Sequence, residues 1–126
     1  LGDVYKRQVL EYLSGKYNLY ILSNGFKELQ SHKMRSSGID EYFKKVVLSD
    51  DIGILKPWPE IFHFALSTTQ SELNNSLMIG DSWENDIVGA AGVGMHQVFY
   101  NLSGRTDLPF APTYQITDLK DLFNFL

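Results

Sequence analysis

Short apolar segments alternate with helix-length segments along the chain, and this alternation is the strongest constraint on its fold. Four segments rich in branched and aromatic residues are expected to be strands, at residues 17–23, 44–51, 76–81 and 96–100. The segments that follow them are expected to be helices, at residues 26–38, 59–69, 84–94 and 117–126. Strands that alternate with helices of about ten residues are typical of a doubly wound α/β fold with a parallel sheet.

Composition excludes several classes of protein. The 126 residues carry a net charge of −4 and include no cysteine, so a disulfide framework and a Cys-ligated metal site are excluded. No run of Lys or Arg forms a basic stripe, so neither a nucleic acid nor a membrane surface is an expected partner. No apolar run is long enough to cross a bilayer and no signal peptide is visible, which favours a cytoplasmic protein.

Two candidate phosphate-binding groups follow predicted strands. Ser23, Asn24 and Gly25 end the first strand, where a hydroxyl, a carboxamide and an accessible backbone N–H can together bind a phosphoryl oxygen. The alternative is an ordinary strand-to-helix turn, because Asn-Gly is a common turn pair. Lys56 precedes Pro57 and supplies a point charge for phosphate, with an ordinary surface lysine as the alternative.

A pair of carboxylates follows the apolar strand "LMIG". Asp81 comes directly after it and Asp86 five residues later, in "LMIGDSWENDIVGA". Carboxylate oxygens are hard ligands suited to Mg²⁺, which needs few protein ligands and retains several waters. The alternative is capping of the next helix by Asp81 or Ser82, and that alternative explains one acid but not both.

The order of these groups resembles motifs two, three and four of the haloacid dehalogenase (HAD) superfamily. The resemblance is carried by "LSNGF", "GILKPWPEIF", "LMIGDSWENDIVGA" and "GVGMHQVFYN", and it covers the chain from about Val9 onward. Within the superfamily the chain looks most like the nucleotidase branch, similar to pyrimidine 5′-nucleotidases. The resemblance implies a Rossmann-like core and Mg²⁺-dependent hydrolysis of a small phosphorylated metabolite, with a nucleoside monophosphate favoured.

The resemblance also implies residue roles. Ser23, and with less weight Asn24, would hydrogen-bond the transferring phosphoryl group, and Lys56 would neutralise its charge and that of the nucleophile. Asp81 would bind Mg²⁺, with Asp86 as second ligand or as partner to a metal-bound water. Ser23, Lys56 and Asp81 would converge at one edge of the sheet.

The first motif of the superfamily, D-x-D-x-T/V, is missing from this chain. Its first Asp becomes the aspartyl-phosphate and its second acts as general acid and base. No two of the aspartates stand two residues apart; they are Asp3, Asp40, Asp50, Asp51, Asp81, Asp86, Asp107, Asp118 and Asp121. The 22 residues before Ser23 are too few for the motif, its strand and a cap domain. We therefore expect a core that lacks its first strand and cap, and a chain that is inactive and poorly stable by itself.

The first residues are interpreted as non-native. "DVYKRQ" at residues 3–8 back-translates to a sequence that looks like the transposon mosaic end used to prepare sequencing libraries. Residues 1–8 are therefore expected to be a translated adapter, and residues 9–126 a partial HAD core domain. The alternative is a genuine helix start in "VYKRQVLEYL".

Other functions stay open on sequence alone. Within the superfamily, the chain could be a 2-haloacid dehalogenase-like or a phosphoglycolate phosphatase-like hydrolase. Outside it, a receiver-type signalling domain uses similar groups, but with its acidic cluster first and its lysine last, the reverse of the order here. A non-catalytic fragment with a relict site is the remaining alternative.

Overall fold

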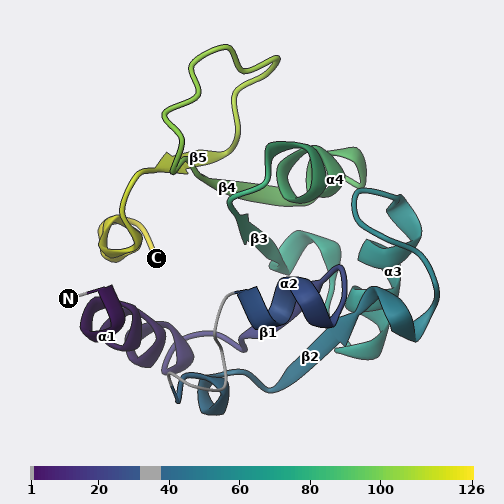
Figure 1. Ribbon diagram of the computed structural model, residues 1–126, viewed down its shortest axis with the longest axis horizontal. Coiled ribbons are helices and arrows are strands. Elements are labelled where there is room, and N and C mark those ends of the chain that lie inside the picture. Colours follow the sequence, from purple (N-terminus) through teal and green to yellow (C-terminus); the bar gives the residue numbers. More distant parts are fainter. Residues whose placement is uncertain (1, 32–37) are drawn as a thin grey trace. The chain divides into compact units, whose positions relative to one another are not determined.

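The computed structural model describes residues 2–31 and 38–126. The chain divides into two compact units, residues 1–53 together with 119–126, and residues 54–118 (Figure 1). Within the described residues, no helix combines the length and the apolar character needed to cross a bilayer.

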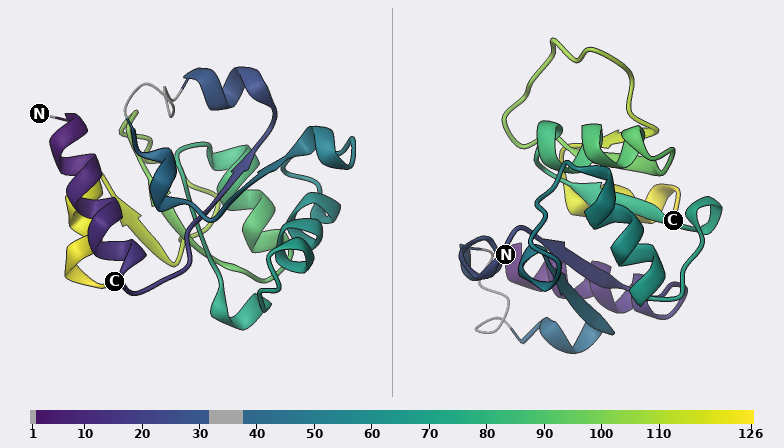
Figure 2. Two further views of the ribbon diagram at one scale, coloured as in Figure 1. Left: turned by 90° about the horizontal axis from the view of Figure 1, so that it is seen from below. Right: turned by 90° about the vertical axis from the view of Figure 1, so that its right-hand side faces the viewer.

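In its described residues, the first unit contains two α-helices, a two-stranded parallel sheet and short 3-10 helices. Its elements are α1 (Gly2–Ser14), β1 (Tyr20–Ser23), α2 (Phe26–Ser31) and β2 (Lys45–Leu48), followed at the end of the chain by a 3-10 helix, Leu119–Asn124. Strands β1 and β2 pair in parallel with Ser23 opposite Leu48. Helix α1 and the 3-10 helix lie side by side (Figure 2), with the rings of Tyr12 and Phe123 in edge contact at 4.9 Å.

The second unit is a three-stranded parallel sheet with two helices. Its elements are α3 (Pro59–Thr68), β3 (Leu77–Gly80), α4 (Val88–Gly92), β4 (His96–Tyr100) and β5 (Tyr114–Ile116), in the strand order β3-β4-β5. A π-helical turn, Trp83–Ile87, leads into α4. The apolar residues of these elements form the core, in which Ile61, Phe62, Ile87, Ala90 and Val98 are each 0% exposed.

Small residues in α4 allow it to pack closely against α3. A Cβ added at Gly89 would lie 2.5 Å from Cε2 of Phe62 and 3.2 Å from Cα of Pro57. The close approach at Gly89 is therefore to the ring of Phe62 in α3.

The α/β class with parallel pairing is confirmed, and the structure refines the details. The strands form two sheets of two and three strands, and in residues 2–31 and 38–126 no ladder joins β1 to β3. The predicted strand 44–51 ends at Leu48, because Ser49–Asp51 forms a 3-10 turn in which the Asp51 carboxylate accepts the N–H of Leu48 at 3.0 Å. The predicted helix 117–126 is the 3-10 helix, and residues 32–37 of the predicted helix 26–38 lie outside the described residues.

Helix α1 continues across residue 8, the predicted boundary between adapter and native chain. Within it, Val9 and Leu13 are 2% and 4% exposed. The assignment of residues 1–8 to a leader stays a prediction.

Candidate active site

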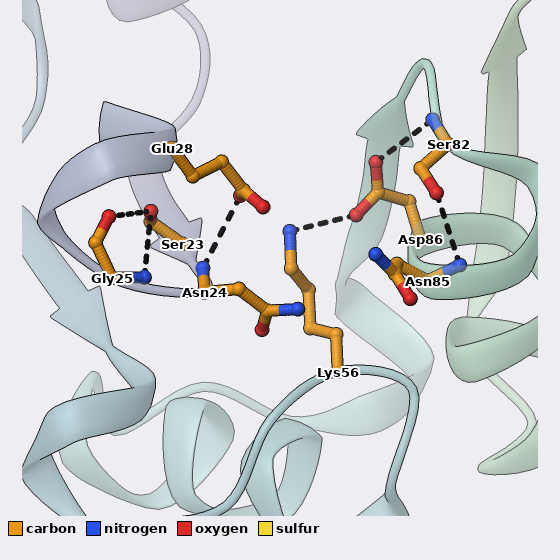
Figure 3. A network of polar contacts seen from close by, with 8 residues as sticks. All are labelled: Ser23, Asn24, Gly25, Glu28, Lys56, Ser82, Asn85 and Asp86. Atoms are coloured by element: carbon orange, nitrogen blue, oxygen red, sulfur yellow. Dashed lines mark hydrogen bonds and ion pairs between the residues drawn. The ribbon is translucent and has the colours of Figure 1, made fainter. Parts of the chain in front are cut away.

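The turn after β1 is closed by the Ser23 hydroxyl. Ser23 is 2% exposed, and its Oγ donates to the Gly25 carbonyl at 2.9 Å and accepts the Gly25 N–H at 3.3 Å (Figure 3). The Asn24 N–H donates to the Glu28 carboxylate at 3.2 Å, at the start of α2. Gly25 has φ of 123°, a backbone conformation that side chains with a Cβ rarely adopt. The local turn reading of this segment is therefore correct, and the phosphate-binding role of Ser23, Asn24 and Gly25 stays a prediction.

Lys56 is not a surface lysine. Its side chain is 4% exposed and its Nζ lies 2.8 Å from Oδ1 of Asp86, whose side chain is 7% exposed (Figure 3). The peptide bond between Lys56 and Pro57 is cis. A buried charge is tolerated only when it is paired and hydrogen-bonded, so the pair with Asp86 is what allows the ammonium group to be buried.

Asp86 is held on both carboxylate oxygens. Oδ1 accepts from Lys56, and Oδ2 accepts the backbone N–H of Ser82 at 3.2 Å. Gly80, the last residue of β3, makes room for this carboxylate, because a Cβ at Gly80 would overlap the Asp86 side chain. The residue directly before Asp81 therefore has to be glycine, because a side chain there would overlap the Asp86 carboxylate.

Ser82 caps the π-helical turn. Its hydroxyl accepts the N–H of Asn85 at 3.2 Å, as an N-cap residue does (Figure 3). The cap is therefore supplied by Ser82, and the helix-capping alternative explains neither acid. Asp86 is explained by its pair with Lys56, which leaves Asp81 without a capping role.

Asp81 lies at the carboxyl end of β3 and is exposed. Gly80 pairs with Phe99 and Tyr100 with Ile116. Asp81 directly after β3, Tyr100 at the end of β4 and Asp118 two residues after β5 therefore lie at the same end of the sheet. Burial, then the negative charges of Asp118 and Asp81, raise the pKa of Tyr100 above its ordinary value. This end of the three-stranded sheet therefore carries a negative field.

The donor set fits Mg²⁺ but not a metal held by many protein ligands. Among the described residues, no group of three or more His, Cys, Asp or Glu side chains could hold a metal ion. Mg²⁺ is commonly bound through one or two carboxylates, with water or substrate oxygens completing its coordination. Asp81, exposed directly after β3, and Asp86, whose carboxylate packs against Gly80, offer such a pair of carboxylates.

The charge of Asp81 should be visible in the titration of Tyr100. In Asp81→Asn we expect the pKa of Tyr100 to fall, because a neighbouring negative charge disfavours the phenolate and its removal favours it. The titration of ¹³Cζ-labelled tyrosine by NMR, from pH 8 through the ordinary tyrosine pKa of about 10, measures the shift. Asp107→Asn is the control, since Asp107 is not among the charges that raise this pKa. An unchanged Tyr100 pKa in Asp81→Asn would contradict the arrangement.

The structure brings together part of the predicted set. Lys56 and Asp86 form one ion pair. Asp86 also packs against Gly80, the residue directly before Asp81. The pairing of Lys56 with Asp86 is not apparent in the sequence, because residues 30 positions apart carry no local signal for it. Ser23 belongs to the other compact unit, so its convergence with Lys56 and Asp81 stays a prediction.

Comparison with known proteins identifies the family of this chain. The model of the haloacid dehalogenase-like hydrolase family matches residues 5–94. HAD-hydrolase YfnB of Bacillus subtilis (strain 168) is 33% identical over 116 residues, which are 90% of this chain and 49% of YfnB. Pyrimidine 5′-nucleotidase YjjG of Escherichia coli (strain K12) is 31% identical over 120 residues, 94% of this chain and 53% of YjjG.

Comparison with solved structures indicates the same family. The magnesium-bound crystal structure of Bacillus subtilis YfnB matches with a TM-score of 0.85 at 31% identity, over 94% of this chain and 53% of that chain. A 2-haloacid dehalogenase from Pseudomonas syringae pv. Tomato DC3000 matches with a TM-score of 0.81 at 29% identity, over 94% of this chain and 50% of that one. The chain thus spans about half the length of these relatives. The chain belongs to the haloacid dehalogenase-like hydrolase family.

Proposed function

We propose that this chain is the part of a Mg²⁺-dependent phosphomonoester hydrolase that binds the metal and the phosphoryl group. The substrate is a small phosphorylated metabolite, with a nucleoside monophosphate favoured, and the reaction passes through an aspartyl-phosphate on a nucleophile motif that these 126 residues lack. The observation that carries the proposal is the buried ion pair of Lys56 and Asp86. Asp86 also accepts the N–H of Ser82, the residue directly after the exposed Asp81, so the pair and Asp81 belong to one local arrangement.

Lys56 supplies fixed positive charge. Phosphoryl transfer spreads negative charge over the equatorial oxygens, so its catalysis depends mostly on positioning and on preorganised positive groups. The pairing of Nζ with Asp86 fixes the position of the ammonium group, which is what preorganised charge requires. Burial strengthens this interaction, because the local dielectric is lower than in water.

Asp81 and Asp86 would hold the metal. Asp81 is the direct ligand, and Asp86 is a second ligand or acts through a water. When bound, Mg²⁺ supplies positive charge to the phosphoryl oxygens. The magnesium in the YfnB structure supports this assignment by similarity.

The turn after β1 would bind the other phosphoryl oxygens. The Ser23 hydroxyl donates to the Gly25 carbonyl in the structure, and on substrate binding it would donate to a phosphoryl oxygen instead. Asn24 and the Gly25 backbone would complete this contact. The similarity to YjjG, a pyrimidine 5′-nucleotidase, supports a nucleotide substrate, and the cytoplasm stays the predicted location.

A 2-haloacid dehalogenase is the second candidate. The structural match to the Pseudomonas syringae dehalogenase favours it, and Ser23-Asn24-Gly25 would suit that chemistry. It makes less use of the acidic pair, because dehalogenation in this superfamily needs no Mg²⁺. A phosphoglycolate phosphatase-like activity differs from the favoured one only in the leaving group.

The proposal is tested by restoring the missing motif. We expect the 126-residue chain to hydrolyse no phosphomonoester, because it has no D-x-D-x-T/V nucleophile. Extension at the N-terminus with a segment that carries this motif and a cap, taken from a family member, is expected to give Mg²⁺-dependent release of phosphate. The assay measures phosphate from nucleoside monophosphates, phosphoglycolate and sugar phosphates, and halide from 2-haloacids.

Each assay arm has an outcome that decides against the proposal. Robust Mg²⁺-dependent turnover by the unextended chain would refute the missing-nucleophile reading. Halide release by the extended protein without Mg²⁺, and no phosphate release with it, would favour the dehalogenase.

A further inference from the structure

The loop between β4 and β5, residues 101–113, begins with a clamp on one arginine. The Asn101 side chain, in a residue 5% exposed, donates to the Arg105 carbonyl at 2.8 Å and accepts the Arg105 N–H at 3.0 Å. These two bonds fix the backbone of Arg105 although the loop contains no helix or strand (Figure 1).

The Arg105 side chain reaches the turn that carries the two aspartates. We call residues 81–87 the acidic turn. Nη1 of Arg105 lies 3.0 Å from Glu84 Oε1 in this turn, and Nε lies 3.1 Å from Asp107 Oδ1 in the loop itself. The guanidinium also stands over the ring of Trp83, 5.7 Å from its centroid.

Trp83 links this contact to the core of the sheet. It is 4% exposed and packs against Phe99 of β4 at 5.2 Å and against Phe110 of the loop at 4.7 Å between ring centroids. Trp83 and Glu84 are the second and third residues after Asp81. The acidic turn is therefore held from two sides, at Asp86 by Lys56 and at Trp83 and Glu84 by Arg105.

These contacts do more for position than for stability. The Glu84 and Asp107 side chains are 73% and 83% exposed, and ion pairs at such exposure stabilise a fold little. A guanidinium with two carboxylate partners and an aromatic ring beneath it does, however, restrict the orientation of the group it holds.

We propose that Arg105 is a positioning residue that fixes the acidic turn and thereby aims Asp81 for metal binding. The inference rests on the proposed role of Asp81 as a Mg²⁺ ligand. In this role Arg105 would act through the acidic turn and would not itself be a ligand of the metal.

The direction in which Arg105→Gln changes the affinity for Mg²⁺ distinguishes a positioning role from a simple electrostatic effect. Removing a positive charge near Asp81 would by itself strengthen the binding of Mg²⁺, whereas loss of positioning weakens it. Asp107→Asn is the matched control, because it removes the other ion pair of Arg105 without touching the acidic turn. Glu84→Gln removes the pair that does reach the turn.

Trp83 serves as the reporter for the titration. The chain has two tryptophans, and Trp58 is 64% exposed, so Trp58→Phe leaves the buried Trp83 as the only tryptophan, which is excited selectively over the tyrosines. In this background, Mg²⁺ is titrated into the full chain and its Arg105→Gln, Glu84→Gln and Asp107→Asn variants. The Mg²⁺ dependence of turnover in the N-terminally extended protein provides a second reading of the same constant.

We expect Arg105→Gln to raise the half-saturating Mg²⁺ concentration about threefold to tenfold. This is below the ~10–100-fold loss typical when the hydrogen-bond partner of a metal ligand is removed. Glu84→Gln should act in the same direction, and Asp107→Asn should leave the constant within about twofold of the unsubstituted protein, as expected for an exposed pair away from the site. Equal or tighter binding in Arg105→Gln, or equal shifts in Arg105→Gln and Asp107→Asn, would overturn the inference.

Failure of the proposed function can be told apart from failure of this inference. If the unsubstituted protein shows no saturation by Mg²⁺ in either reading, the metal role of Asp81 fails. Amide hydrogen exchange of residues 82–87 then tests the positioning alone: exchange should be faster in Arg105→Gln than in Asp107→Asn, and equal exchange would refute it.

Discussion

Replacing Asp81 by Asn is expected to reduce the Mg²⁺-dependent turnover of the N-terminally extended protein by more than about 100-fold. Loss of a partner that merely supports a metal ligand typically costs about 10–100-fold, and loss of the direct ligand should cost more. The exposed position of Asp81 after β3 makes this substitution a clean one, because Asn has the same shape and Asp81 has no part in capping the following turn. Phosphate release at increasing Mg²⁺ concentration measures the loss.

Asp86→Asn is the informative comparison. We expect it to reduce turnover less through the metal, if Asp86 acts through a water, but to destabilise the fold, because Asp86 is the partner of a buried lysine. Asp81→Asn should leave the free energy of unfolding within about 0.5 kcal/mol, as is usual for an exposed site. Equal activity of Asp81→Asn and the unsubstituted protein at saturating Mg²⁺ would contradict the role of Asp81 as a metal ligand.

The strands could be predicted because each is a short apolar run that ends at polar residues. β1, β2, β3 and β4 all lie within the predicted segments. β5 was not predicted, because "YQI" is three residues long and only Ile116 is buried. The division of the strands into two sheets depends on which strands pair, and the residues of a strand do not specify its neighbour.

The helix after β3 shows why local patterns are incomplete. The sequence predicts a regular helix over residues 84–94, but its first turn is π-helical, with the Ile87 N–H bonded to the Ser82 carbonyl at 3.3 Å. The wider turn accompanies the packing of the Asp86 side chain against Gly80. That packing depends on a tertiary contact, which helix periodicity does not encode.

The candidate site, like the fold, could be predicted only in part. Asp81 stands out in the sequence because it is the first polar residue after the apolar run "LMIG". The burial of Lys56 and its pairing with Asp86 could not be predicted. Considered by itself, a lysine before a proline is more often an ordinary surface lysine. Arg105 was not singled out, since its contacts with Trp83 and Glu84 arise only when the loop folds back on the turn.

Replacing Lys56 by Met is expected to lower the free energy of unfolding by about 3–5 kcal/mol, the range found when one partner of a buried ion pair is removed. Met is similar to Lys in length, so little packing is lost, and the effect comes from the Asp86 carboxylate left buried without its cation. Urea unfolding of the N-terminally extended protein measures it. Lys44→Met is the control, because Lys44 is exposed and its replacement should change stability by no more than about 0.5 kcal/mol.

The double variant Lys56→Met/Asp86→Leu separates the structural role of the pair from its chemical role. Replacing both partners of a buried ion pair by apolar groups of similar shape is often neutral or stabilising, so we expect most of the lost stability to return. The difference between the double and the single variants gives the coupling energy of the pair. Turnover should stay lost in the double variant, because a Met side chain carries no charge toward the phosphoryl group. Recovery of both stability and turnover would show that Lys56 only supports the fold, and that the positive charge for phosphoryl transfer comes from another group.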